Sequence, residues 1–121
     1  MCASLCACQK KDNTTPDAAN VTFTITSPTA GQVYRSGDSV RVKATIVYPS
    51  ELHGYEIRVS DSATNTVVYD AAVHGHADRF DVDNAWAIGG ANAMTLKLEL
   101  IATIDHDGTT AGKKMNFQYA P

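Results

Sequence analysis

A strict alternation of apolar and polar residues, which runs through most of the chain from residue 21 onwards, is the feature that constrains this sequence most. It is cleanest between residues 94 and 104, where the apolar positions are Met94, Leu96, Leu98, Leu100, Ala102 and Ile104. Successive side chains of a β-strand point to opposite faces, so a period of two predicts strands with one buried and one wet face. No stretch of the chain has the apolar period of an amphipathic helix. The sequence therefore predicts an all-β protein.

Alternating runs of this kind occur at residues 21–26, 40–48, 55–60, 67–73, 80–88, 94–104 and 115–119. Residues typical of turns separate the runs, such as Pro28 and Gly31 after the first. About seven short strands in roughly 100 residues are typical of an immunoglobulin-like (Ig-like) antiparallel β-sandwich, which we expect to span residues 21–121. Ile46, Trp86 and Leu98 lie in the middle of their runs, and we expect them in the core.

Composition narrows the class of protein further. A chain of 121 residues with 44% hydrophobic content can bury an ordinary core. Its three cysteines all lie within the first eight residues, so no disulfide is expected in the sandwich. The net charge of −3 and the absence of a basic stripe argue against a nucleic-acid partner.

The N-terminal residues predict export and a lipid anchor. Residues 1–8 end in Leu5-Cys6-Ala7-Cys8, which matches a bacterial lipoprotein cleavage box with Cys8 as the lipidated residue. Residues 9–20 are polar and contain no large apolar side chain, so we expect a flexible tether. A secretory signal also needs a positive start and an apolar run. Residues 1–5 supply neither, and we expect Met1 to lie inside a longer hydrophobic segment.

Two other interpretations of these cysteines are open. In the first, the protein is cytosolic and its three cysteines have no common role. In the second, Cys2, Cys6 and Cys8 bind a metal, but they lack a fourth ligand and the spacing of structural zinc sites.

Taken with the lipidation box and tether, the turn motifs carry a resemblance to a known family. These motifs are Pro28-Thr29-Ala30-Gly31, Ser36-Gly37-Asp38 and Asp105-His106-Asp107-Gly108. The chain resembles the small single-domain Ig-like lipoproteins of the cell envelopes of Bacteroidota. The resemblance covers the whole chain and implies an outer-membrane-anchored protein, facing the periplasm or the cell surface. Because the matching motifs are turn sequences, the resemblance indicates the architecture of the protein more than its activity.

The histidines are the residues most suggestive of a site. Connections between antiparallel strands alternate between the two ends of a sandwich, so residues 49–53, 74–76 and 105–108 should share one end. All four histidines fall in these segments: His53, His74, His76 and His106. Loops at the ends of such sandwiches are where binding sites are found.

Imidazole is a good ligand for zinc and copper, and a His-x-His pair on extended backbone points both rings to the same side. His53 or His106 could then complete a metal site with His74 and His76. Asp78, Asp105 and Asp107 are available as carboxylate ligands or as acceptors that orient a ring N–H. The alternative is that these histidines are ordinary loop residues.

Motifs of common enzyme classes are missing: the sequence has no G-x-S-x-G, P-loop or H-E-x-x-H pattern. We therefore expect a non-enzymatic, lipid-anchored binding or interaction module with a protein partner in the envelope. One alternative is a protein that binds zinc or copper through its histidines. Another is a structural envelope subunit that docks by adding a strand to an exposed sheet edge.

Overall fold

The computed structural model describes residues 20–121; the predicted lipidation site at Cys8 and nearly all of the predicted tether lie outside this range. The described residues form six strands: β1 (Thr22–Ser27), β2 (Val33–Arg35), β3 (Ser39–Asp61), β4 (Val67–Ala87), β5 (Met94–Thr103) and β6 (Thr110–Ala120). No α-helix occurs among them. Within residues 20–121, therefore, no helix has the length and hydropathy that crossing a membrane requires.

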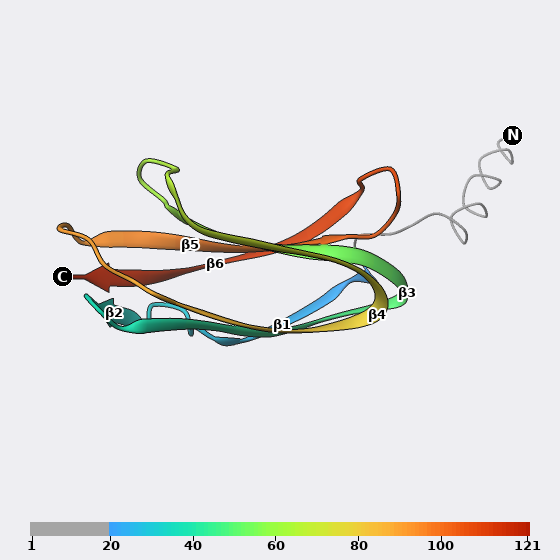
Figure 1. Cartoon of the computed structure of the whole chain (residues 1–121), viewed down its shortest axis with the longest axis horizontal. Coiled ribbons are helices and arrows are strands. Elements are labelled where there is room, and N and C mark those ends of the chain that lie inside the picture. Colours follow the sequence, from blue (N-terminus) through green and yellow to red (C-terminus); the bar gives the residue numbers. More distant parts are fainter. Residues whose placement is uncertain (1–19) are drawn as a thin grey trace, which may run out of the picture.

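The strands form two layers packed face to face, as Figure 1 shows. In one layer, β1 and the C-terminal half of β4 flank the N-terminal half of β3. In the other layer, the N-terminal half of β4, the C-terminal half of β3, β5 and β6 lie in that order, all antiparallel. The short β2 adds to β6 in parallel. The predicted Ig-like antiparallel β-sandwich is confirmed.

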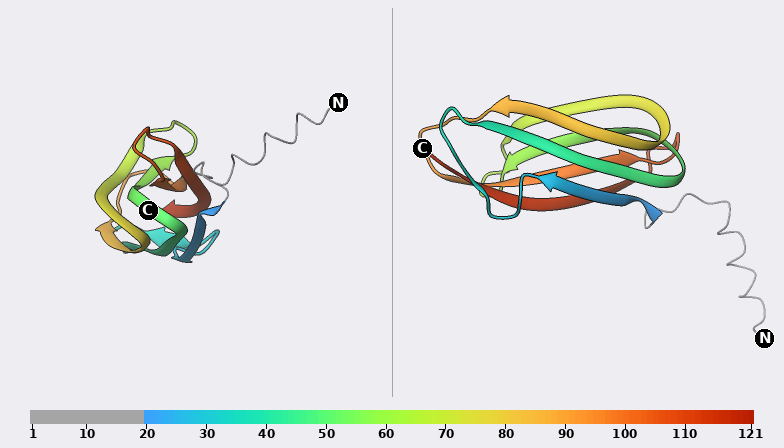
Figure 2. Two further views of the ribbon diagram at one scale, coloured as in Figure 1. Left: turned by 90° about the vertical axis from the view of Figure 1, so that its right-hand side faces the viewer. Right: turned by 90° about the horizontal axis from the view of Figure 1, so that it is seen from below.

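Two of the predicted loops are wrong, because β3 and β4 are each continuous across both layers. Residues 49–53 were expected to interrupt one strand and residues 74–76 another, but both segments are strand. The long β3–β4 hairpin instead bends over one end of the sandwich (Figures 1 and 2). Each of its strands therefore supplies two of the seven predicted runs, one to each layer.

Irregular pairing allows the hairpin to bend. The β3–β4 register shifts between Val47 and Leu52, and again between Leu52 and Gly54. Pro49 lies in the first irregular stretch, where it has no ladder hydrogen bond to lose. Gly54 has a φ of +142°, and a Cβ on it would stand 2.6 Å from the carbonyl oxygen of Val73. Only glycine permits the two backbones to approach this closely.

The core lies between the layers and follows the alternation that the sequence shows. Ile46 and Leu98 are fully buried, as predicted. The buried face of β3 passes from even positions such as Val42 to odd positions such as Ile57, because the irregular pairing at the bend changes which side chains face inward.

Trp86 is only partly buried, which differs from its predicted place in the core. It packs against the buried cluster from β4, the strand at the margin of both layers. Its ring stacks on that of Tyr69, with centroids 4.2 Å apart and planes 4° from parallel. The Asn84 amide donates a hydrogen bond of 3.0 Å to the Tyr69 hydroxyl. These β4 side chains close one side of the sandwich.

Truncation of Leu98 tests the strand register. We expect Leu98→Ala to lower the free energy of unfolding by about 2–5 kcal/mol, the usual cost of removing a buried leucine side chain. Chemical denaturation measures the change. Val67→Ala is a suitable control because Val67 is 49% exposed, and it should cost about 0.5 kcal/mol or less. Equal denaturation midpoints for Leu98→Ala and wild type would contradict the register.

Candidate metal centre

The bend in the β3–β4 hairpin brings all four histidines to one end of the sandwich. His53 lies on β3, while His74 and His76 lie on β4, all three within the bent part of the hairpin. Only His106 is in a loop, the connection between β5 and β6. That loop lies at the same end as the bend in Figures 1 and 2. The histidines thus share one end, as the strand order predicted, but three of them are on strands.

The four imidazole rings form a continuous cluster. The His53 ring lies centrally, with its centroid 4.3 Å from that of His106 and 4.7 Å from that of His76. His76 in turn lies 5.3 Å from His74 and 6.1 Å from His106, also between ring centroids. The cluster combines residues of two strands and one loop, and the tertiary structure brings them together.

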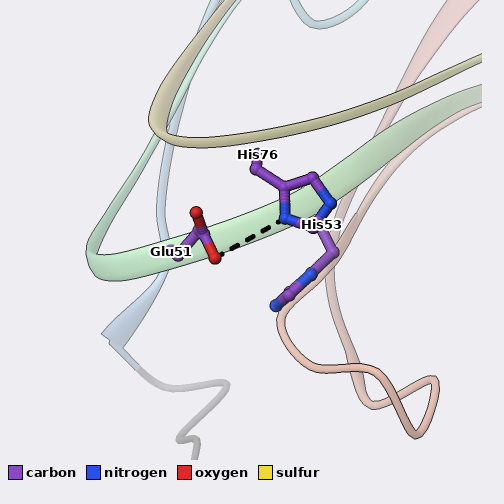
Figure 3. Close-up of side chains that lie close together, drawn as sticks. All are labelled: Glu51, His53 and His76. Atoms are coloured by element: carbon purple, nitrogen blue, oxygen red, sulfur yellow. Dashed lines mark ion pairs between the residues drawn. The ribbon is translucent and has the colours of Figure 1, made fainter.

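Glu51 joins the cluster, and sequence reasoning missed it. Its Oε1 lies 3.5 Å from Nδ1 of His76, the contact drawn in Figure 3. One ligand atom each from Glu51, His53 and His76 lie within 4.8 Å of one another. The sequence carried one signal for it, the Glu51-x-His53 spacing, because alternate residues of extended backbone point to the same side.

The environment of His53 differs from that of its neighbours. Its Nδ1 atom is buried and has no hydrogen-bond partner among residues 20–121. A polar atom buried without a partner costs about 1–3 kcal/mol. By contrast, the Glu51 and His76 side chains are 58% and 42% exposed. The cluster therefore combines one sheltered, unsatisfied imidazole with two donors that solvent reaches.

A pocket of about 510 Å³ opens beside the cluster. Its lining includes His53, His74, His106 and Asp105, together with the less polar Ile101. Tyr55 also borders it, and burial, with Tyr69 as a second cause, raises the pKa of this phenol. Tyr55 therefore presents a neutral hydroxyl at physiological pH. The pocket leaves space for a small molecule or a side chain next to three of the imidazoles.

The three aspartates predicted as further ligands differ in position. Asp105 borders the pocket, and its Oδ1 accepts hydrogen bonds from the backbone N–H groups of Asp107 and Thr109, both at 2.9 Å. Asp78 and Asp107 are exposed. Among the described residues, neither belongs to the group of ligand atoms around Glu51, His53 and His76.

Two imidazoles and one carboxylate make a donor set that can hold a metal ion. Zinc binds nitrogen and oxygen ligands at about 2.0–2.2 Å, so donors in a tetrahedral site stand about 3.4 Å apart. The Glu51–His76 pair, at 3.5 Å, already meets this separation. Small rotations of these exposed side chains toward His53 would bring the third donor into range. A set of three protein ligands leaves at least one position of the ion open.

Comparison with known proteins identifies the fold alone. No protein-family model matches the chain, and no curated protein matches it in sequence. Among solved structures, a fibronectin(III)-like module of Clostridium thermocellum CbhA matches with a TM-score of 0.51 and 17% identity, over 81% of this chain and 94% of that chain.

Two other structures match at lower identity. The sporulation control protein Spo0M of Bacillus subtilis has a TM-score of 0.57 at 6% identity, over 84% of this chain and 49% of the longer Spo0M chain. A CARDB domain from Pyrococcus furiosus, solved in complex with di-metal ions, has a TM-score of 0.50 at 11% identity, over 87% of this chain and 89% of that domain. The fibronectin-like and CARDB neighbours are Ig-like β-sandwiches, and so is this chain.

Substitution of Asp105 tests the loop that carries His106. Hydrogen bonds from the hydroxyl and then the backbone N–H of Thr109 lower the pKa of the Asp105 carboxyl. A lowered folded-state pKa stabilises the fold above the unfolded-state value, and that stabilisation is lost as pH falls through the folded-state value. We expect Asp105→Ala to be less stable than wild type at neutral pH.

The difference should shrink in strong acid, where the wild-type carboxyl is also protonated. Thermal unfolding at several pH values measures it, and Asp105→Asn is the control because it keeps the acceptor oxygen. A difference between Asp105→Ala and wild type that does not depend on pH would exclude the carboxylate as its source.

Proposed function

We propose that this protein is a non-catalytic, lipid-anchored module of the cell envelope that captures a zinc or copper ion at its histidine end. The observation that carries the proposal is the arrangement of Glu51, His53 and His76, whose ligand atoms lie within 4.8 Å of one another. His53 is the central ligand of this site. An ion bound at its buried Nδ1 would supply the partner that this atom lacks within the described part of the chain.

The donor types favour zinc and copper over magnesium and calcium. Imidazole nitrogen suits zinc and Cu(II), whereas magnesium and calcium prefer sites made of oxygen ligands. His106, whose ring lies 4.3 Å from that of His53, is placed to supply a fourth ligand. In that role it would tie the β5–β6 loop to the bent hairpin, so the metal would link β3, β4 and this loop.

The envelope location is proposed from the N-terminal sequence. The Leu5–Cys8 box would place a lipid on Cys8, and residues 9–20 would connect it to the sandwich. Thr22, near the start of β1, pairs with Val47 just before the hairpin bends. The chain therefore enters the sandwich at the histidine end, and a tether from Cys8 would arrive there too.

A second candidate function is docking to an envelope protein by strand addition. β4 has 21 residues and, in the described part of the chain, pairs with β3 alone, so its other edge is free. Val67, Val68 and Val73 on this strand are exposed. An exposed edge can accept a strand from a partner. Purification of the lipidated protein from detergent extract without any stoichiometric partner would remove this candidate.

Calorimetric titration tests metal capture. The tag-free wild-type protein should bind one zinc or Cu(II) ion per chain at neutral pH. The double substitution His53→Ala with His76→Ala should weaken binding more than about 100-fold, since changes outside the direct ligands already cost about 10–100-fold. Glu51→Gln should weaken it less, because one ligand is lost and the imidazoles remain.

Asn92→Ala is the matched control, because Asn92 is exposed and lies in the connection between β4 and β5 at the opposite end. Denaturation curves for each variant establish that the sandwich is intact. Absence of stoichiometric heat with zinc and copper, or binding that survives the double substitution, would overturn the proposal.

Fractionation tests the lipid anchor. Expressed with a complete signal sequence, the wild type should partition into detergent extracts of membranes, and Cys8→Ser should be released. The physical reason is the acyl chains, since each buried CH₂ contributes about 0.8 kcal/mol to membrane binding. Cys6→Ser serves as the control because it alters a neighbouring cysteine and keeps the acceptor. A wild type found entirely in the aqueous fraction would contradict lipidation.

A further inference from the structure

The cluster contains more metal donors than one ion needs. Glu51, His53, His76 and His106 are enough for the four positions of a tetrahedral ion. His74 is a fifth donor, outside this set but next to it, with its ring 5.3 Å from that of His76. Binding of one ion at equilibrium needs only the other four donors, so it does not explain why His74 lies beside them.

His74 lies where an ion would enter or leave. It is exposed and borders the pocket, which also reaches His53 and His106. Alternation along β4 places the His74 and His76 side chains on the same side of the strand. An ion can therefore be held by this pair while its bonds to the sheltered His53 are absent.

The site is also open to solvent. Structural zinc sites are closed to exchanging groups. Here Glu51 and His76 are about half exposed, and the adjoining pocket of about 510 Å³ has room for a donor group from another molecule. This arrangement suits an ion that is passed on.

We propose, on the basis of the metal capture proposed above, that the cluster is a transfer site in which His74 is the exchange ligand. In the releasing direction, a lone pair of His74 binds the ion as the bond from His53 or His106 breaks. A carboxylate or imidazole of an acceptor in the pocket then replaces the remaining protein ligands one at a time. Each step forms one metal–ligand bond and breaks one, with no change in oxidation state. Capture follows the same steps in reverse.

Because ligands are exchanged one at a time, His74 affects the rate of metal transfer much more than the affinity for the metal. Without His74, the ion must lose a ligand before another arrives, which raises the barrier. The bound state with Glu51, His53, His76 and His106 is unchanged. His74 therefore acts on the kinetics of exchange, whereas the other donors determine the dissociation constant.

Stopped-flow transfer of zinc from the loaded full-length protein to an excess of a chromophoric chelator tests this role. We expect His74→Ala to slow transfer by about tenfold, equivalent to a barrier increase of about 1.4 kcal/mol. Its dissociation constant for zinc, from calorimetry, should change by less than about threefold. Free imidazole should restore the transfer rate of His74→Ala, because it replaces the missing donor.

His74→Gln keeps a side chain of similar reach without the imidazole and should transfer as slowly as His74→Ala; Asn92→Ala is the control at the far end. An unchanged transfer rate in His74→Ala would overturn the transfer role while leaving metal capture intact. A loss of affinity as large as the loss of rate would also overturn it, since His74 would then be an ordinary ligand. Failure of the wild type to bind zinc would overturn metal capture itself.

Discussion

The bend of the β3–β4 hairpin joins the two layers of the sandwich. Both strands cross from one layer to the other without a break, and they stay hydrogen-bonded to each other on either side of the bend. β1 pairs with the half of β3 before the bend and β5 with the half after it. The two layers therefore share strands, and their relative position is determined by one irregular stretch of pairing around Pro49 and Gly54.

The same irregular stretch carries the candidate metal centre. Where the strands bend, Glu51, His53 and His76 converge, and the β5–β6 loop adds His106 beside them. An isolated buried nitrogen on His53 is unfavourable for stability. This nitrogen belongs to the residue at which Glu51 and His76 converge.

The two ends of the sandwich differ accordingly. The end with the bend has all four histidines of the chain, Glu51, Asp105 and a pocket, and it is where the chain enters β1. At the other end are the β3–β4 and β4–β5 connections and the C-terminus (Figure 1). Similarity to fibronectin-like and CARDB domains identifies the fold alone. The candidate metal centre lies at the end with the bend.

The sequence predicts the fold class, the buried positions of most strands and the end of the sandwich that has the histidines, whereas Val67 and Val73 of the 67–73 run are exposed. Alternation of apolar and polar residues predicts which side chains of a strand are buried. Connections between antiparallel strands place successive turns at opposite ends of the sandwich. Only the tertiary structure shows that β3 and β4 continue through the expected loops. Pro49, Gly54 and Gly75 are residues typical of loops, but the irregular pairing of the hairpin accommodates them within strands. The tertiary structure also decided that Glu51 faces His76. Alternation cannot predict a pairing across a bulge, because the register there depends on how the two backbones bend together.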